Sequence, residues 1–435
     1  MNVLFYLNHL LKRLGIIIGS MIWLVLVTLL GLVFVEDAEA KVTAAMGAKV
    51  YKVLEETQKH IDAENYDKAM GKLIPLKSSE KLSNYERAQV FNLVGYIHYL
   101  KNDYRSAAKA YERVLKLPEL PPALRQSSLK TLSQLSLINE NYSRAISAAN
   151  ELLDMLDKPD SNTLMVLGQA YFQLEKYKKA KGPVKQAIGI SKKAGHIPKE
   201  NWLQLLNGIY HNLSEYQSMI GVLNELIRYY PKKQYLQTLA GVYSELGQTR
   251  KQLSISEALY EGGHMLRSSE VRNLATLYLL HGVPYKAAKL LVNEIESGKL
   301  NAEEKILKLL SQAWVQAGED AKAIKPLEEV ARQTRDAEIY RRLGFAQFNL
   351  GLWKESEKSL KTALKIGGLK DSGGAWLMLG MSRYRNKSYD DAIKAFSNAA
   401  KHKKHRNSAQ QWIAFIEIEN ERRKELEDYN QFGNS

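Results

Sequence analysis

The chain contains no cysteine, and this absence limits how it can be stabilised and how it can be attached to a membrane. Without cysteine there is no disulfide framework, so packing alone must hold the fold together. A lipid cannot be attached through an N-terminal cysteine either, which excludes a bacterial lipoprotein. Proline is also scarce, with ten residues in 435, and no long Ser/Gly-rich or charge-block linker divides the sequence. These features favour one continuous helical array over a string of separate domains.

Motifs for catalysis and metal binding are missing as well. The nine histidines show no HExxH spacing and no paired metal geometry. His402 and His405 lie three residues apart in a basic turn, where like charge opposes a metal ion. The glycine-rich stretches at 261–265 and 365–374 lack the order of a phosphate loop, and no GxSxG motif is present. We therefore expect no cofactor, no metal and no enzymatic activity.

What the chain has in abundance is a repeated helical pattern. Residues 375–396 read AWLMLGMSRYRNKSYDDAIKAF, in which Trp376, Leu379 and Gly380 share one helix face and Ala392 and Phe396 share another beyond a polar turn. This predicts two short helices with small residues at their closest approach. An aromatic residue followed three places later by alanine recurs along the chain, and weaker copies with other residues at one or both positions bring the total to ten. The pairs are Tyr66/Ala69, Tyr104/Ala107, Tyr142/Ala145, Tyr177/Ala180, Tyr216/Met219, Thr249/Gln252, Pro284/Ala287, Asp320/Ala323, Trp353/Ser356 and Tyr389/Ala392.

Successive copies of this pattern are 33 to 39 residues apart. A period of about 34 with this pattern is the tetratricopeptide signature, so the sequence resembles the tetratricopeptide repeat family over roughly residues 50–400. The resemblance implies an all-α tetratricopeptide-repeat superhelical solenoid of about ten helix pairs, spanning residues 41–407. Residues 408–435 then form a C-terminal capping helix and tail. We expect Trp412, Phe415 and Ile416 to face inward on that helix and the ERRKE segment at 421–425 to face solvent.

The N-terminus predicts export. Lys12 and Arg13 precede an uncharged apolar run at 14–35, and acidic residues follow it, which orients the remainder away from the cytoplasm. Residues 38–40 have the small-x-small form of a cleavage site, which makes 1–40 a signal peptide removed near Ala40. The run is also long enough to span a bilayer, so a retained inner-membrane anchor stays open. Either way we expect a periplasmic protein of a Gram-negative bacterium.

The chain is basic, with a formal net charge of +15. Without residues 1–40 it has 60 basic and 44 acidic residues, a net charge of +16. Such a charge suits an acidic protein segment or an anionic membrane surface. Nucleic acid is not expected, because the tyrosines are accounted for by repeat packing and not by stacking on bases. The basic cluster at 401–406 is either a solvated turn or a contact for lipid headgroups or an acidic segment.

In the tetratricopeptide repeat family the first helix of each pair lines a groove, which implies a set of candidate peptide-binding residues. They are Asn92, Tyr96, Gln134, Gln169, Phe172, Gln173, Gln204, His211, Gln237, Arg272, Lys308, Gln312, Arg341, Phe348, Asn349, Tyr384 and Arg385. Amides that both donate and accept suit an extended peptide backbone, and rings suit its side chains. The alternative is that these are only solvated first-helix positions.

A narrower resemblance concerns the central and C-terminal repeats. The stretches QTLAGVYSELG, LYLLHGVPYKAAKLL and IGGLKDSGGAWLMLG are similar to exported tetratricopeptide proteins encoded beside a second TonB-type energy-transduction system. This implies a non-enzymatic protein–protein interaction scaffold, accessory to TonB, ExbB and ExbD-type inner-membrane components in iron-chelate uptake. Two alternatives stay open: a general cell-envelope assembly or secretion scaffold, and an auxiliary subunit of a cell-wall enzyme.

Overall fold

The computed structural model describes residues 46–265 and 267–432, and within them it contains 21 helices and no strand. The predicted signal or anchor helix at 1–40, including the apolar run at 14–35, lies outside the described residues. The chain forms two compact units, the first ending at Pro231 and the second beginning at Lys232. Each is described by itself.

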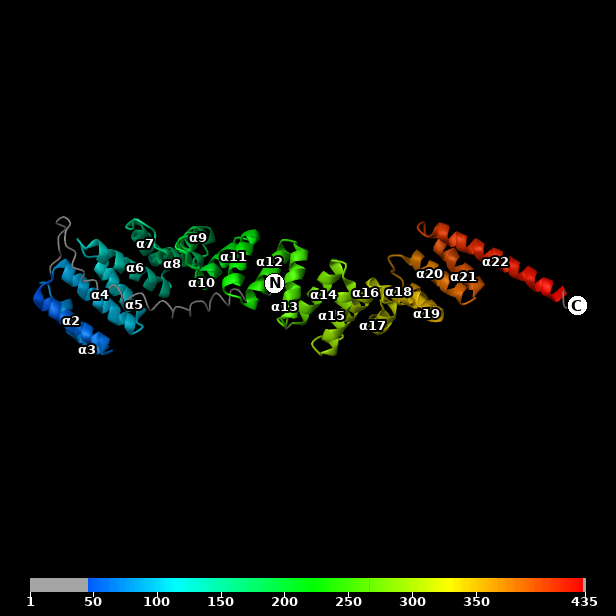
Figure 1. Cartoon of the computed structure of the whole chain (residues 1–435), viewed down its shortest axis with the longest axis horizontal. Helices are drawn as coiled ribbons and strands as arrows, with labels where there is room; N and C mark the ends of the chain where they lie inside the picture. The colour runs from blue at the N-terminus through cyan, green and yellow to red at the C-terminus, as the bar shows by residue number, and fades with distance from the viewer. Residues whose placement is uncertain (1–45, 266, 433–435) are drawn as a thin grey trace. The chain divides into compact units, whose positions relative to one another are not determined.

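The first unit is built of five consecutive helix pairs, drawn from blue to green in Figure 1. The helices are α2 (Ala48–Asp62), α3 (Tyr66–Lys77), α4 (Asn84–Leu100), α5 (Tyr104–Leu115), α6 (Pro122–Ile138), α7 (Tyr142–Asp154), α8 (Ser161–Gln173), α9 (Tyr177–Lys193), α10 (Glu200–Asn212) and α11 (Tyr216–Tyr229). Within the unit each helix packs on the next one along the chain, so the core grows pair by pair.

The second unit contains five further pairs and a final single helix. The helices are α12 (Lys233–Glu245), α13 (Thr249–Glu261), α14 (Ser268–Leu280), α15 (Pro284–Glu296), α16 (Glu304–Gln316), α17 (Asp320–Thr334), α18 (Ala337–Asn349), α19 (Trp353–Ile366), α20 (Ser372–Arg385), α21 (Tyr389–Ala400) and α22 (Arg406–Phe432). The prediction of about ten helix pairs is therefore confirmed for the described residues.

The turn inside each pair has the same geometry in all ten copies. Two residues before each second helix, one residue has positive φ, between 56° and 75°. These residues are Glu64, Asn102, Glu140, Glu175, Ser214, Gly247, Gly282, Gly318, Gly351 and Lys387. Each second helix then begins at the first member of a predicted pair, from Tyr66 to Tyr389. The sequence periodicity therefore identifies the turns correctly.

Small residues allow the two helices of a pair to approach closely, as predicted. Ala69, Ala107 and Ala392 are fully buried. A Cβ atom added at Gly168 would lie 2.3 Å from Val184 Cγ2, and one added at Gly380 would lie 2.6 Å from Phe396 Cε1. In both cases the glycine lies on the first helix and its neighbour is sixteen residues later on the second. A side chain at either position would therefore push the pair apart.

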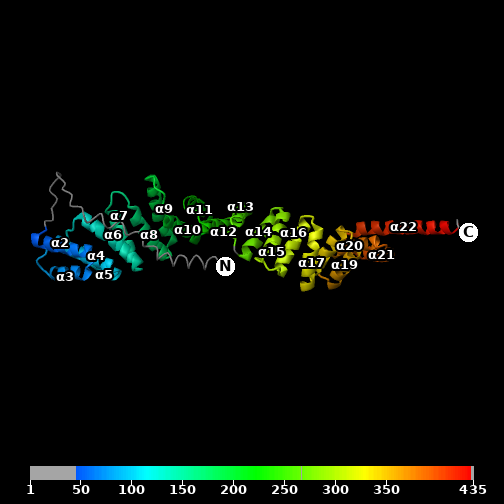
Figure 2. The same ribbon diagram turned by 60° about the horizontal axis from the view of Figure 1, so that its bottom comes forward.

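The capping helix α22 packs on α21 (Figure 2), but not every residue predicted to face inward is buried. Ile416 is fully buried, and the Trp412 ring stacks on Phe396 with centroids 5.6 Å apart and planes 5° apart. The inward assignment of Phe415 is wrong, because 45% of this residue stays exposed while its edge rests on Trp412. The 421–425 segment is not wholly outward either, since the Arg423 guanidinium lies 4.1 Å from the Tyr389 ring centroid.

None of the helices in residues 46–265 and 267–432 combines the length and the apolar character that crossing a membrane requires.

Candidate functional site

All seventeen predicted groove residues lie on first helices, from α4 to α20. Eight belong to the first unit and nine to the second. The expected placement on first helices therefore agrees with the structure, and the residues of each unit are considered separately. What each side chain contacts decides which of them can meet a ligand.

The predicted groove rings mainly pack against the turn within their own pair. Phe172 lies on Tyr177, Phe348 on Trp353 and Tyr384 on Tyr389, each with ring centroids 4.8 to 5.7 Å apart. His211 and Tyr216 pair in the same way at 6.4 Å. Each partner is five residues further along, where the second helix starts. These ring pairs hold the turn closed through edge-to-face contacts.

Phe172 is the clearest correction among these rings. Only 8% of the residue is exposed, and its ring also approaches the position where a Cβ of Gly208 would be, at 3.6 Å. The side chain is therefore part of the core between α8 and α10 and not a surface for a ligand. Tyr384 is also largely covered, since Trp412 and Phe415 of α22 pack on its ring.

Most of the predicted polar groove residues of the second unit are already engaged within the chain. The Asn349 amide donates to Asp320 at 2.8 Å, and the Gln237 amide donates to Glu270 at 3.4 Å. Arg341 donates to Glu338 at 2.7 Å. Arg385 lies 5.7 Å from the Trp353 ring centroid. Arg272, by contrast, is exposed.

The first unit offers fewer charged candidates. Asn92, Gln134 and Gln169 are half-buried, whereas Gln173 is exposed. The pKa of Tyr96 is raised, first because burial disfavours the phenolate and second because of the negative charge of Asp62. Tyr96 therefore stays a neutral donor and acceptor at physiological pH.

Two predicted residues, Lys308 and Gln312, line a pocket of about 390 Å³ in the second unit. The Lys308 ammonium lies 2.8 Å from Glu304 and 3.5 Å from Asp336, so it bridges α16 and the residue that caps α18. Its pKa is raised above the ordinary value, first by the hydrogen bond to Glu304 and also by the charge of Asp336. This ammonium group therefore stays protonated and links α16 to the start of α18 through its two ion pairs.

We call this pocket, between the first helices α16 and α18, the inner pocket. Its remaining lining residues were not predicted from the sequence. They are Lys305, Leu309, Asp336, Glu338, Ile339 and Arg342. On α16 the lining residues are spaced three and four apart, which is the spacing of one helix face. That signal was visible in the sequence, but only the structure shows that α18 supplies the opposite wall. The pocket combines cations, carboxylates and an amide, which suits an extended peptide with charged side chains.

The basic cluster at 401–406 proves to be tied to the array. The His405 imidazole lies 2.7 Å from an Asp371 oxygen and Lys404 lies 3.2 Å from the other. Asp371 also accepts from the Gly374 backbone N–H at the start of α20, at 2.9 Å. Partial burial alone would raise the pKa of Asp371, but the Gly374 N–H, His405 and Lys404 together hold it at about 2. His405 and Lys404 of the cluster therefore link the turn before α22 to the start of α20.

No group of three or more potential metal-ligating side chains occurs in the part of the chain that the structure describes. The inner pocket contains no histidine, hydroxyl or thiol beside its carboxylates. Its lining offers cations, carboxylates and an amide, which can form ion pairs and hydrogen bonds.

Helix pairs of this geometry, repeated along both units, define a helical repeat protein, and family comparison identifies the repeat. Models described as tetratricopeptide repeat match residues 88–119, in the first unit, and residues 341–409, in the second. A segment of each unit is therefore similar to tetratricopeptide repeats.

Several solved structures are similar to this chain at low identity. A tetratricopeptide repeat protein from Parabacteroides merdae is 17% identical, covering 61% of this chain and 99% of that chain, with a TM-score of 0.37. The TPR2AB domain of yeast Sti1 in complex with pHSP90 is 14% identical, covering 61% and 98%, with a TM-score of 0.33. MamA from Desulfovibrio magneticus is 17% identical, covering 42% and 96%, with a TM-score of 0.36. No curated protein matches the chain.

Proposed function

We propose that this protein is a non-enzymatic scaffold that binds a protein partner through the inner pocket between α16 and α18. The observation that carries this proposal is that, within the described residues, the pocket contains one cation already paired with carboxylates and two that are not. Lys308 is held by two carboxylates, whereas Lys305 and Arg342 have no carboxylate within 4.0 Å among the described residues. Two available cations beside an amide favour an acidic, extended segment of a partner.

We further propose that the scaffold works in the periplasm, beside a TonB-type energy-transduction system with ExbB and ExbD-type components. The apolar run at 14–35 with its flanking charges supports export. The resemblance of the central and C-terminal repeats to exported tetratricopeptide proteins of such systems supports the choice of partner. In this role the protein holds inner-membrane components in place for iron-chelate uptake and performs no chemistry itself.

The experiment is affinity capture of the C-terminally tagged protein from crosslinked envelopes of iron-starved cells. Recovery of TonB-type components supports the proposed role. Recovery of assembly or export proteins in their place favours a general envelope scaffold, and copurified hydrolase activity favours an auxiliary subunit of a cell-wall enzyme.

The pocket itself is tested by charge reversal. Lys305→Glu combined with Arg342→Glu should weaken capture of the acidic partner, because each reversed charge repels it. Lys289→Glu combined with Lys325→Glu is the matched control, since these exposed lysines lie on second helices of the same unit. Equal capture by both double variants would remove the inner pocket from the proposal. Arg341 is less suitable for this test because it is already paired with Glu338.

A further inference from the structure

One stretch of the first unit is rich in lysine and lacks acidic residues altogether. Residues 176–199, which cover α9 and the loop after it, contain eight lysines and neither aspartate nor glutamate. Two of these lysines are neutralised by a neighbouring helix. Lys181 lies 2.7 Å from Glu215, and Lys192 lies 2.6 Å from Glu225.

The other lysines of α9 extend from a smooth helix face. Lys178, Gly182, Lys185 and Gly189 follow one another at intervals of four, three and four residues, so they lie along one stripe. Apart from the backbone of α9 itself and the adjacent residues, no atom lies within 4 Å of where a Cβ of either glycine would be. The face therefore has no side chain that projects between its lysines. Within the described residues, no carboxylate lies within ion-pair distance of Lys178, Lys185 or the neighbouring Lys193.

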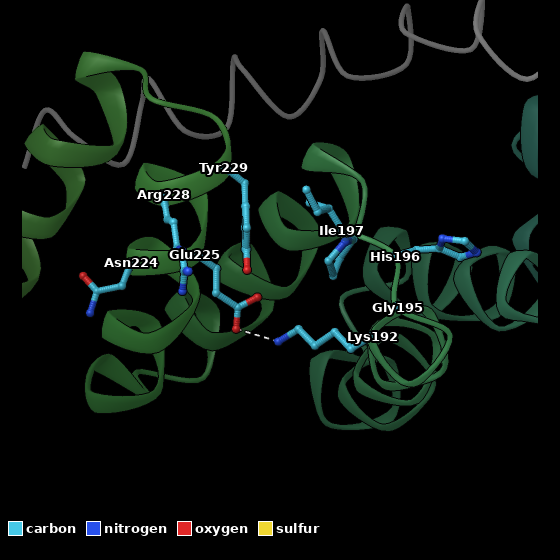
Figure 3. Close-up of a pocket in the computed structure, with 9 residues that line it drawn as sticks. Lys192, Gly195, His196, Ile197, Asn224, Glu225, Arg228 and Tyr229 are labelled. Atoms are coloured by element: carbon cyan, nitrogen blue, oxygen red, sulfur yellow. Dashed lines mark hydrogen bonds and ion pairs between the residues drawn. The ribbon is translucent and has the colours of Figure 1, made fainter.

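The stripe ends at a hollow that carries exposed apolar groups (Figure 3). This hollow, of about 490 Å³, lies between the end of α9, the loop after it and the end of α11. Ile197, on the loop, is 57% exposed, and Tyr229, at the end of α11, is 37% exposed. Figure 3 shows the two on opposite sides of the hollow, with the ion pair of Lys192 and Glu225 beneath them.

A cation lies against one of these apolar groups, and another follows in the loop. The Arg228 guanidinium lies 5.4 Å from the Tyr229 ring centroid, and Lys199, two residues after Ile197, places its ammonium 5.4 Å from the Trp202 ring centroid. Exposed isoleucine and tyrosine beside lysine and arginine are the side chains that bind a membrane interface, where the apolar group enters the acyl boundary and the cations contact the headgroups.

We propose that this outer surface, formed by the lysine face of α9, the 194–199 loop and the end of α11, docks on an anionic lipid surface. It goes beyond the proposed function, because it uses outer helices of the first unit and not the inner pocket of the second. Nucleic acid fits less well, since stacking of successive bases needs several exposed rings among the cations, whereas Tyr229 lies at the end of α11 and Tyr177, the ring of α9, packs on Phe172. A protein segment would need a groove along the stripe, which the bare glycines do not provide.

The test uses the full-length protein with vesicles that contain phosphatidylglycerol, and vesicles of phosphatidylcholine alone for comparison. Lysine acetylation is then followed residue by residue by mass spectrometry, a readout that does not depend on how the N-terminal segment partitions. We expect Lys178, Lys185 and Lys193 to be protected about 5-fold or more on the anionic vesicles, since each lysine near such a surface favours binding by about that factor. High salt should abolish the protection, because the screening length falls to about 3 Å at 1 M.

Lysines 354, 358 and 365 of α19 are the internal control. They are also exposed and lie on a second helix of the other unit, where glutamates 355 and 357 accompany them. They should be acetylated at the same rate with both kinds of vesicle. Equal protection of the two lysine sets, or equal protection by neutral vesicles, would overturn the proposal.

Variants separate the two kinds of contact. Replacing Lys178, Lys185 and Lys193 by glutamine should abolish the protection of the remaining Lys179, because each replaced lysine weakens binding about 5-fold, whereas the same triple replacement at 354, 358 and 365 should not change it. Ile197→Ser should lower the protection of Lys193 several-fold, and Ile366→Ser, at a residue 44% exposed, should not. Protection by polyglutamate but not by anionic vesicles would instead assign the surface to an acidic polypeptide and refute the lipid proposal.

Discussion

Gly380 allows the sharpest test of how these helix pairs are held together. The residue lies in α20 and faces Phe396 of α21, where an added Cβ would be 2.6 Å from Cε1 and 2.7 Å from Cδ1. Ordinary contact begins near 3.4 Å, so the two helices must separate by about 0.8 Å at this point. The ring cannot easily turn away, because Phe396 is fully buried and stacks on Trp412 of the capping helix.

The change in stability expected for Gly380→Ala is the sum of two opposing contributions. Overpacking of a buried contact costs about 1–3 kcal/mol, whereas replacing glycine by alanine within a helix gains about 1 kcal/mol. Gly241 of α12 isolates the second term, because it lies on an exposed helix face and an added Cβ there meets nothing within 4 Å. Gly241→Ala should therefore stabilise by about 1 kcal/mol, and Gly380→Ala should be about 1–3 kcal/mol less stable than Gly241→Ala.

The assay must be local, since repeat arrays need not unfold in one step. Hydrogen exchange measured by mass spectrometry over α20, α21 and α22 reports the opening free energy of the last pair and its cap. We expect Gly380→Ala to speed exchange there and leave the first unit unchanged, while Gly241→Ala slows exchange over α12. If both variants stabilise their own helices equally, the close approach of α20 and α21 does not contribute as argued.

Three further outcomes are expected. The pKa of Asp371 is lowered to about 2, so its contribution to stability is present above pH 4 and is lost as the pH falls through about 2; the urea midpoints of wild type and Asp371→Asn should converge over that range. Burial, and then the hydrogen bond to Glu294, raises the pKa of Tyr260 to about 12, so its stabilisation is complete below pH 10 and is lost as the pH rises through 12. Tyr260→Phe should cost about 1–2 kcal/mol at neutral pH, and equal urea midpoints would refute this. Arg423→Ala should lower the protection of α22 against exchange by about 0.5–1 kcal/mol, with loss of the contact to Tyr389; unchanged exchange would show that the contact contributes nothing.

Much of the fold could be predicted from the sequence because the same helix–turn–helix pattern occurs ten times. A ring or its substitute at the start of each second helix and a small residue three places later recur at a nearly constant period. Weak copies such as Thr249/Gln252 are recognised only because their neighbours fix the register. The capping helix was predicted less well, since Phe415 and Arg423 depend on where a single helix rests on one neighbour.

The candidate site could be predicted only in part, because family position says which face a residue lies on and not what it contacts. Phe172 has a groove position but is buried against its own turn. Its partner Tyr177, five residues later, could have indicated this from the sequence. Arg342 was overlooked because its importance depends on a pocket wall contributed by α16, which no local pattern reveals.

The two proposed surfaces can be separated experimentally because they share neither a unit nor a class of helix. The inner pocket uses the first helices α16 and α18 of the second unit, and the outer surface uses the second helices α9 and α11 of the first. A variant that loses lipid protection at Lys185 should therefore still capture the protein partner. A variant at Arg342 should show the opposite behaviour. If either substitution abolishes both lipid protection and partner capture, the two surfaces do not bind independently, and the assignment of one ligand to first helices and another to second helices is wrong.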